Sequence, residues 1–205
     1  MKRLILFFCS ITMVSCSAFQ SSSGGLYEKK FQVQTSSGLV SNDPGKPDLV
    51  FFVWQDMPFA KPPVGDLRWR APRPLDSPRR IISPKDDTAC VQKASVYAGA
   101  TGKGIVGSED CLYLDITAPI DFEDKSYPVM FWIHGGGNTS GLKDYYDYSK
   151  LVSTRGVVVV RTNYRLGALG WFTHPSIQGS QEGTDKTSNF GTLDIIQSLK
   201  WVPAN

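Results

Sequence analysis

The sequence predicts an α/β fold, because buried strands alternate with helices in the second half of the chain. Residues 129–133 and 157–160 are continuous apolar runs, which are typical of strands covered on both faces of a sheet. Helical patterns occupy residues 144–155, which end before Gly156, and residues 189–202, which precede a proline. Strands joined by helices imply a mixed, mostly parallel central sheet with flanking helices.

Shorter elements are expected in the first half of the chain. Apolar and polar residues alternate from Phe31, and Ser37 with Gly38 offers a turn, so a small N-terminal β-hairpin is predicted. Residues 49–53 are a short apolar run that predicts a strand. The proline-rich stretch 58–74 predicts extended and turn conformations over the surface, because proline does not sustain a helix.

The middle of the chain predicts a loop and a further strand. Residues 98–107 contain four glycines and indicate a loop. Apolar residues at alternate positions between 112 and 116 favour a half-buried strand. We expect the strand at 157–160 to be the unpaired edge of this part of the sheet, which favours aggregation. In the last helix Leu193, Ile196 and Leu199 recur at helical spacing.

The N-terminus has the pattern of an export signal. Lys2 and Arg3 precede an apolar run at residues 4–14 that is too short to span a bilayer, so residues 1–18 are predicted to be a signal peptide. The end of this leader resembles a bacterial lipobox, in which Cys16 is acylated and becomes the mature N-terminus. The alternative is ordinary cleavage after Ala18.

Export has consequences for location, charge and partners. The protein is expected to be secreted or held at the cell envelope, with membrane attachment only through a lipid on Cys16. Residues 19–30 are polar and predict a flexible tether before a folded domain at 31–205. The formal charge of +3 falls to +1 without Lys2 and Arg3, and no basic stripe is present, which argues against a nucleic-acid partner.

Two cysteines, Cys90 and Cys111, remain outside the leader. In an exported protein such a pair favours one disulfide, whereas two unpaired core thiols are the alternative.

The segment with the clearest chemistry is His134-Gly135-Gly136-Gly137, directly after a predicted strand. Consecutive glycines let backbone N–H groups point at one spot without interfering side chains. Such donors stabilise the oxyanion that forms during acyl transfer, and this motif occurs in the oxyanion hole of lipases and esterases. Three glycines alone are also typical of a flexible turn.

Five segments in order indicate a known family. The chain resembles the type-B carboxylesterase/cholinesterase family, of the α/β-hydrolase superfamily, from about Phe31 to its last residue. The matching segments are residues 60–69, 108–114, 134–137, 163–167 and 189–194. The resemblance implies the N-terminal part of an α/β-hydrolase fold and, for the whole protein, hydrolysis of a small-molecule carboxylic ester without a cofactor.

The resemblance also implies roles for individual residues. The backbone N–H groups of Gly136 and Gly137 match the oxyanion donors of this loop. The remaining matches are structural: a disulfide between Cys90 and Cys111, and ion pairs between Arg68 and Glu109 and between Arg165 and Asp194. Two positions depart from the pattern, because Asn138 replaces a common aromatic residue and Asp56 replaces a common glycine. Aspartate tolerates positive φ better than most residues, so the Pro58-Phe59-Ala60 turn that follows Asp56 is expected to survive.

No Gly-x-Ser-x-Gly nucleophile elbow occurs in the sequence. His134 belongs to the glycine motif, and His174 is interpreted as a surface or structural residue. We therefore expect this chain to lack the nucleophile, the acid and the catalytic histidine, and to be inactive alone. The alternatives are a cholinesterase-like binding protein without catalysis and a truncated remnant. Two histidines forty residues apart give no zinc spacing, and no phosphate-binding loop is present.

Overall fold

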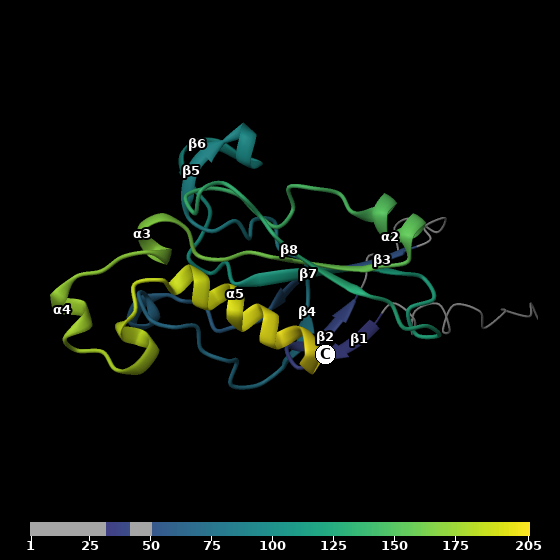
Figure 1. Ribbon diagram of the computed structural model, residues 1–205, viewed down its shortest axis with the longest axis horizontal. Coiled ribbons are helices and arrows are strands. Elements are labelled where there is room, and N and C mark those ends of the chain that lie inside the picture. The colour runs from purple at the N-terminus through teal and green to yellow at the C-terminus, as the bar shows by residue number, and fades with distance from the viewer. Residues whose placement is uncertain (1–31, 42–50) are drawn as a thin grey trace, which may run out of the picture.

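The computed structural model describes residues 32–41 and 51–205 (Figure 1). The predicted leader, Cys16, the tether and the first residues of two predicted strands (Phe31, and residues 49–50) lie outside these ranges.

The main sheet has the strand order β3-β7-β9-β8. Its strands are β3 (Phe51–Pro58), β7 (Tyr113–Pro119), β9 (Val158–Thr162) and β8 (Val129–Ile133). β7 pairs antiparallel with both β3 and β9, whereas β8 and β9 are parallel. The predicted mixed sheet is confirmed, and in the described residues one of its three pairings is parallel.

β7 was expected to be half buried, and this expectation is wrong. The strand lies between β3 and β9, and six of its seven residues are buried. Because both faces are covered, the positions between the apolar residues also point into the protein, and Asp115 is one of them. A charge at such a position needs internal partners.

The positions expected for strands β8 and β9 in the sheet are reversed in the structure. β9 is internal and buried, whereas β8 pairs with β9 alone among the described strands and forms the edge. Val129, Met130 and Ile133 are 51%, 47% and 42% exposed. The predictions that residues 129–133 are covered on both faces and that 157–160 form the open edge are therefore wrong. After the edge strand β8, the chain crosses over and forms the next strand, β9, between β8 and β7.

The remaining described strands form two smaller sheets. The predicted hairpin is confirmed as β1 (Gln32–Thr35) and β2 (Gly38–Ser41), and β4 (Arg79–Ile82) adds parallel to β2. β5 (Gln92–Ser95) and β6 (Ala100–Val106) form an antiparallel pair.

The second pair shows that the loop predicted at 98–107 is wrong. All four glycines of this stretch, including Gly99 with φ 77°, adopt positive φ values that permit the turn and the irregular register, so pairing with β5 overrides the composition. The predicted surface course of residues 58–74 is also wrong at its start, because Phe59 and Ala60 are buried. The rest of that stretch contains one short 3-10 turn, η1 (Gly65–Leu67).

Four α-helices lie in the described part of the chain, and Figure 1 shows α5 alongside the sheet with α4 and α2 toward opposite ends. They are α2 (Ser149–Arg155), α3 (Gly167–Gly170), α4 (Pro175–Gln178) and α5 (Phe190–Trp201). Three further 3-10 turns are η2 (Val96–Ala98), η3 (Gly183–Lys186) and η4 (Val202–Ala204).

Both predicted helices form, with corrections. α2 begins five residues later than expected, where the Asp147 carboxylate accepts a hydrogen bond from the Ser149 N–H at 2.8 Å, and it ends at Gly156 with φ 59°. In α5, Ile196 and Leu199 of the predicted apolar series are exposed. The buried face instead presents Phe190, Gly191, Asp194, Ser198 and Trp201.

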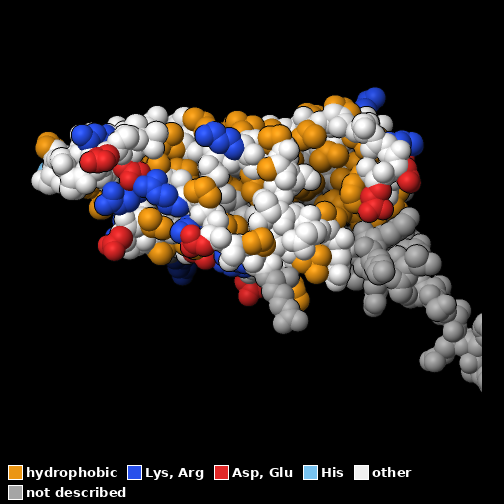
Figure 2. Space-filling model, turned by 90° about the horizontal axis from the view of Figure 1, so that it is seen from below, with side chains coloured by type: hydrophobic (Ala, Val, Ile, Leu, Met, Phe, Trp, Pro, Cys, Tyr) orange, Lys and Arg blue, Asp and Glu red, His pale blue; other side chains and the backbone are white. Residues whose placement is uncertain are grey.

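The core lies between the sheet, the hairpin and α5. Phe52, Trp54 and Phe122 pack edge to face or tilted, with ring centroids 5.2 to 5.9 Å apart. The Trp201 indole donates a hydrogen bond to Ser37 Oγ at 2.7 Å and so docks the end of α5 on the hairpin. On the face in Figure 2, hydrophobic side chains are scattered over the surface, and charged side chains of both signs lie among them.

Candidate functional site

The glycine loop, residues 134–141, follows the end of β8. Gly136 has φ 108° and Gly137 has φ 61°. The Gly136 carbonyl accepts hydrogen bonds from the backbone N–H groups of Thr139 and Ser140 at 3.1 and 3.2 Å, which closes a tight turn. Within the described residues, the N–H groups of Gly136 and Gly137 donate no hydrogen bond, and both residues are exposed. Free, adjacent donors of this kind can bind an anionic oxygen.

Glycine is required at position 136 by the turn itself. A Cβ atom there would lie 2.0 Å from the Ser140 carbonyl oxygen, whereas at Gly137 no atom lies within 4 Å of the added carbon. The two glycines therefore differ. At position 136 a side chain would clash with the Ser140 backbone, whereas at position 137 only the positive φ favours glycine.

His134 anchors the start of the loop. The Tyr164 hydroxyl donates a hydrogen bond to the His134 carbonyl at 2.8 Å, and the two rings stack with centroids 4.3 Å apart. The His134 Nδ1 atom lies 2.9 Å from the Gly135 carbonyl oxygen. Burial lowers the pKa of His134, so its imidazole is neutral at pH 7 and is suited to packing rather than to proton transfer.

Two further contacts hold the middle and the end of the loop. The Gly167 N–H donates to the Asn138 carbonyl at 2.7 Å. Gln92 of β5 clamps Gly141 through both amide atoms, accepting from its N–H at 2.8 Å and donating to its carbonyl at 2.9 Å. The loop is thus held at three places by two segments, residues 164–167 and Gln92 of β5, which limits how far its free donors can turn.

A pocket of about 370 Å³ lies between the glycine loop and the β5–β6 pair. Its aromatic wall consists of Trp132, Tyr97, Tyr145 and Tyr146, and the loop contributes backbone from Gly135 to Gly136. No carboxylate, lysine or arginine lines it among the described residues. Gly136, one of the two residues with a free N–H, therefore borders a space suited to uncharged groups.

Both predicted ion pairs are brought together. Arg68 Nε and NH2 lie 2.6 and 2.5 Å from the Glu109 carboxylate oxygens, and Arg165 Nε and NH2 lie 2.8 and 2.7 Å from those of Asp194. The pairs differ in burial: 40% and 23% of the Arg68 and Glu109 side chains are exposed, against 3% and 0% for Arg165 and Asp194. The first pair is a surface contact, and the second is part of the core.

The predicted disulfide between Cys90 and Cys111 is present, with Cα atoms 5.0 Å apart. It closes a loop with a sequence separation of 21, for which the chain-entropy account gives about 3 kcal/mol of stabilisation. This loop carries β5, β6 and Tyr97, and so one wall of the pocket.

Asp56 and Asn138 both have positive φ, 57° and 62°. Asp56 lies inside β3, where the register with β7 is irregular, and the expected change of direction follows as a bend at Phe59 and Ala60. His174 caps α4 by accepting a hydrogen bond from the Ser176 N–H at 3.2 Å, which is the structural role predicted for it.

Sequence reasoning missed a group of charged residues, which we call the Lys143 cluster: Asp56, Asp115, Lys143, Asp144 and Arg161. Four of them are buried, and the Asp144 side chain is 38% exposed. The only signal was Asp56 at a place where glycine is common, since the members come from four separate segments. A second missed group joins Arg70 and Arg73 to Asp185, whose pKa these arginines lower against the opposing effect of burial.

Neither a metal centre nor a membrane helix is found in ranges 32–41 and 51–205. No group of three or more His, Cys, Asp or Glu side chains there could hold a metal ion. Of the helices in the same ranges, none combines the length and the apolar character needed to cross a bilayer.

Comparison with known sequences decides the family. A sequence model of the carboxylesterase family matches residues 29–205. The chain belongs to the carboxylesterase family. The glycine loop therefore lies in a fold that is also found in solved carboxylesterases.

Individual relatives agree with this assignment. The chain is 40% identical to fumonisin B1 esterase of Sphingopyxis macrogoltabida, with 87% of this chain and 32% of the relative covered. It is 38% identical to para-nitrobenzyl esterase of Bacillus subtilis, with 74% and 30% covered. The structure of a thermophilic PNB esterase matches with a TM-score of 0.71 and 34% identity, with 85% of this chain and 35% of that one covered. The chain spans about a third of the length of these proteins.

Proposed function

We propose that the whole protein hydrolyses small-molecule carboxylic esters through an acyl-enzyme, and that residues 31–205 supply the oxyanion loop. A serine outside residues 1–205 attacks the ester carbonyl carbon, the alcohol leaves with the serine proton, and water then releases the acid. The N–H groups of Gly136 and Gly137 stabilise the negative oxygen in each tetrahedral intermediate.

The observation that carries this proposal is the pair of free N–H groups on an anchored loop. A flexible glycine turn would not need a carbonyl that accepts from two N–H groups, nor anchors at His134, Asn138 and Gly141. The adjoining pocket is large enough for a small organic group and lacks charged side chains among the described residues, as suits a neutral ester.

The test compares two proteins on p-nitrophenyl butyrate. Residues 1–205 alone are expected to hydrolyse no faster than their Gly136→Pro variant, because no nucleophile elbow is present. The protein produced from the complete native gene is expected to turn the ester over and to lose activity with a serine-directed fluorophosphonate. Absence of turnover in that protein would favour the binding protein or the remnant, and fluorophosphonate-blocked turnover by residues 1–205 would reveal a missed nucleophile.

We also propose that residues 1–18 direct export and that Cys16 becomes an acylated N-terminus, with residues 19–30 as a tether. Support comes from the basic start, the apolar run and the residues before Cys16. The mature protein is then held at the cell envelope, in a compartment where the Cys90–Cys111 disulfide is stable.

The mass of the mature N-terminal peptide checks this. A peptide that begins at Cys16 and carries acyl chains is expected, and a Cys16→Ser variant should lose both the lipid and membrane association. A peptide that begins at Phe19 would show ordinary cleavage, and an intact Met1 would contradict export.

A further inference from the structure

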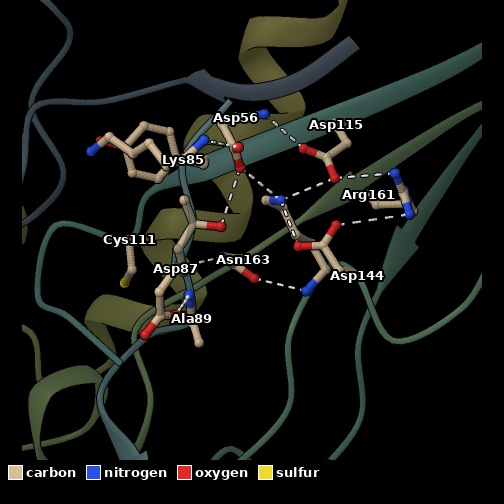
Figure 3. A network of polar contacts seen from close by, with 12 residues as sticks. Asp56, Lys85, Asp87, Ala89, Cys111, Asp115, Asp144, Arg161 and Asn163 are labelled. Atoms are coloured by element: carbon tan, nitrogen blue, oxygen red, sulfur yellow. Dashed lines mark hydrogen bonds and ion pairs between the residues drawn. The ribbon is translucent and has the colours of Figure 1, made fainter. Parts of the chain in front are cut away.

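The Lys143 cluster has no place in the roles assigned so far, and Lys143 itself comes two residues after the end of the glycine loop. The Lys143 Nζ atom lies 2.9 Å from Asp56 Oδ1, 3.0 Å from Asp115 Oδ2 and 2.8 Å from Asp144 Oδ2. Figure 3 shows the three carboxylates turned toward one another, with Arg161 beside Asp115 at 3.1 Å. Asp56, Asp115 and Arg161 come from β3, β7 and β9, so the cluster joins three neighbouring strands.

Lys143 and Asp115 are buried, so their charges need partners inside the protein. The Lys143 side chain is 1% exposed and that of Asp115 is 0% exposed. Burial lowers the pKa of Lys143, but the carboxylates of Asp115, Asp144 and Asp56 more than offset it and raise that pKa, so the ammonium stays charged. An ammonium has three donors, and here each of them faces a carboxylate.

The excess of carboxylates has its own consequence. Three carboxylates share two cations, and burial, with Asp144 nearby, raises the pKa of Asp115 to about 7 against the opposing effect of Lys143 and Arg161. Asp115 remains tied to its neighbours in either state, because its Oδ1 atom also accepts the Asp56 N–H at 2.8 Å. The ammonium is thus held by a network rather than by a single partner.

The segment that carries Lys143 is the exit of the glycine loop. Residues 142–148 form no helix or strand. The backbone N–H of Lys143 donates to Asn163 Oδ1 at 2.8 Å, and Arg161 NH1 donates to the Tyr146 carbonyl at 3.2 Å. Since no strand pairing holds this segment, its position depends on these side-chain contacts with the sheet, which act beside the Gln92 contacts at Gly141.

We propose that Lys143 is a positioning residue of the glycine loop: its ammonium, gripped by Asp56, Asp115 and Asp144, fixes the loop exit on the sheet and so directs the Gly136 and Gly137 N–H groups. The catalytic part of this inference rests on the proposed esterase function. The anchoring part rests on the contacts alone, and the two can be tested separately.

The first experiment replaces Lys143 by methionine, which keeps the length of the side chain and removes its charge. Backbone hydrogen exchange is followed by mass spectrometry in the protein expressed from the complete native gene. Exchange of the peptide that covers residues 134–142 is expected to become roughly tenfold faster, with a smaller change in β7. Lys150→Met, at an exposed position of α2, is the matched control and should leave both peptides unchanged.

Lys143→Met leaves buried carboxylates without their cation and can prevent folding. A second variant therefore tests the same role of Lys143 with fewer unpaired charges. Asp56→Asn combined with Lys143→Met removes one charge of each sign. Asparagine tolerates φ 57°, and its amide can still accept from the Lys85 N–H and donate to Thr88 Oγ1. The loop peptide of this variant is expected to exchange faster in the same way.

Kinetics then tests the link to catalysis. Donors that act on the transition state change kcat rather than KM, so kcat for p-nitrophenyl butyrate is expected to fall about tenfold in either variant while KM stays within about twofold. Unchanged exchange of residues 134–142 in the folded variants overturns the inference, whatever the activity. An equal rise across the whole chain also overturns it, since that indicates a loss of global stability. An inactive parent protein refutes the proposed function, and the exchange result still decides the role of Lys143.

Discussion

Replacing Gly136 by alanine is expected to lower kcat about a hundredfold in the protein from the complete native gene, with little change in KM. The new Cβ would lie 2.0 Å from the Ser140 carbonyl oxygen, and φ 108° is not open to alanine. The backbone must therefore rotate, and the N–H group turns away from the oxyanion. Loss of one such donor costs about 10²–10³ in kcat.

Gly137→Ala is the matched comparison for this experiment. No atom lies within 4 Å of its added Cβ, and φ 61° is the left-handed conformation, which strains alanine by about 1 kcal/mol. A strain of this size is worth at most about fivefold in kcat. Steady-state kinetics of both variants with p-nitrophenyl butyrate measures the difference, and a Gly136→Ala enzyme as fast as the parent would remove Gly136 from the oxyanion site.

The second large effect concerns stability. Asp194→Ala is expected to lower the Tm of the protein by roughly 10 °C, because it strands the Arg165 guanidinium inside the core at a cost of about 3–5 kcal/mol. Asp194 also accepts the Arg165 backbone N–H at 3.0 Å, so with Nε and NH2 three donors of Arg165 lose their acceptor. Burial raises the pKa of Asp194 while Arg165 opposes the rise.

Glu109→Ala removes the same kind of partner from the half-exposed Arg68 and serves as the control. Arg68 can turn to water, so the Tm is expected to stay within about 2 °C of the parent value. Thermal unfolding followed by circular dichroism measures both variants. Equal shifts in Tm would contradict the distinction drawn between a core pair and a surface pair.

Turns and loops formed by neighbouring residues were predictable from the sequence, whereas the order of the strands in the sheet was not. The glycine loop, the hairpin and the stop at Gly156 each depend on residues next to one another, and all three form. β8 and β9 are apolar runs of the same kind, and their sequence does not say which lies inside the sheet, because that depends on a crossover of the chain.

The same reason explains the missed cluster. Asp56, Asp115 and Lys143 are far apart in the sequence, and each resembles an ordinary surface charge when it is read alone. Only the antiparallel register of β3 and β7 places the two aspartates together, and Lys143 reaches them from a segment without regular structure. In α5, helical spacing identified the helix but not its buried face, because Asp194 and Ser198 are internal partners rather than solvent contacts.

The docking of Trp201 on Ser37 links residues 164 positions apart. An isolated two-stranded hairpin is marginal in water, and contacts between distant residues form slowly because a long loop must close first. A chain made from its N-terminus therefore completes the surroundings of its first hairpin only after residue 201 has been added. During synthesis, the hydrogen bond that docks α5 on the first hairpin therefore forms late, after β4 has already become available to pair with β2.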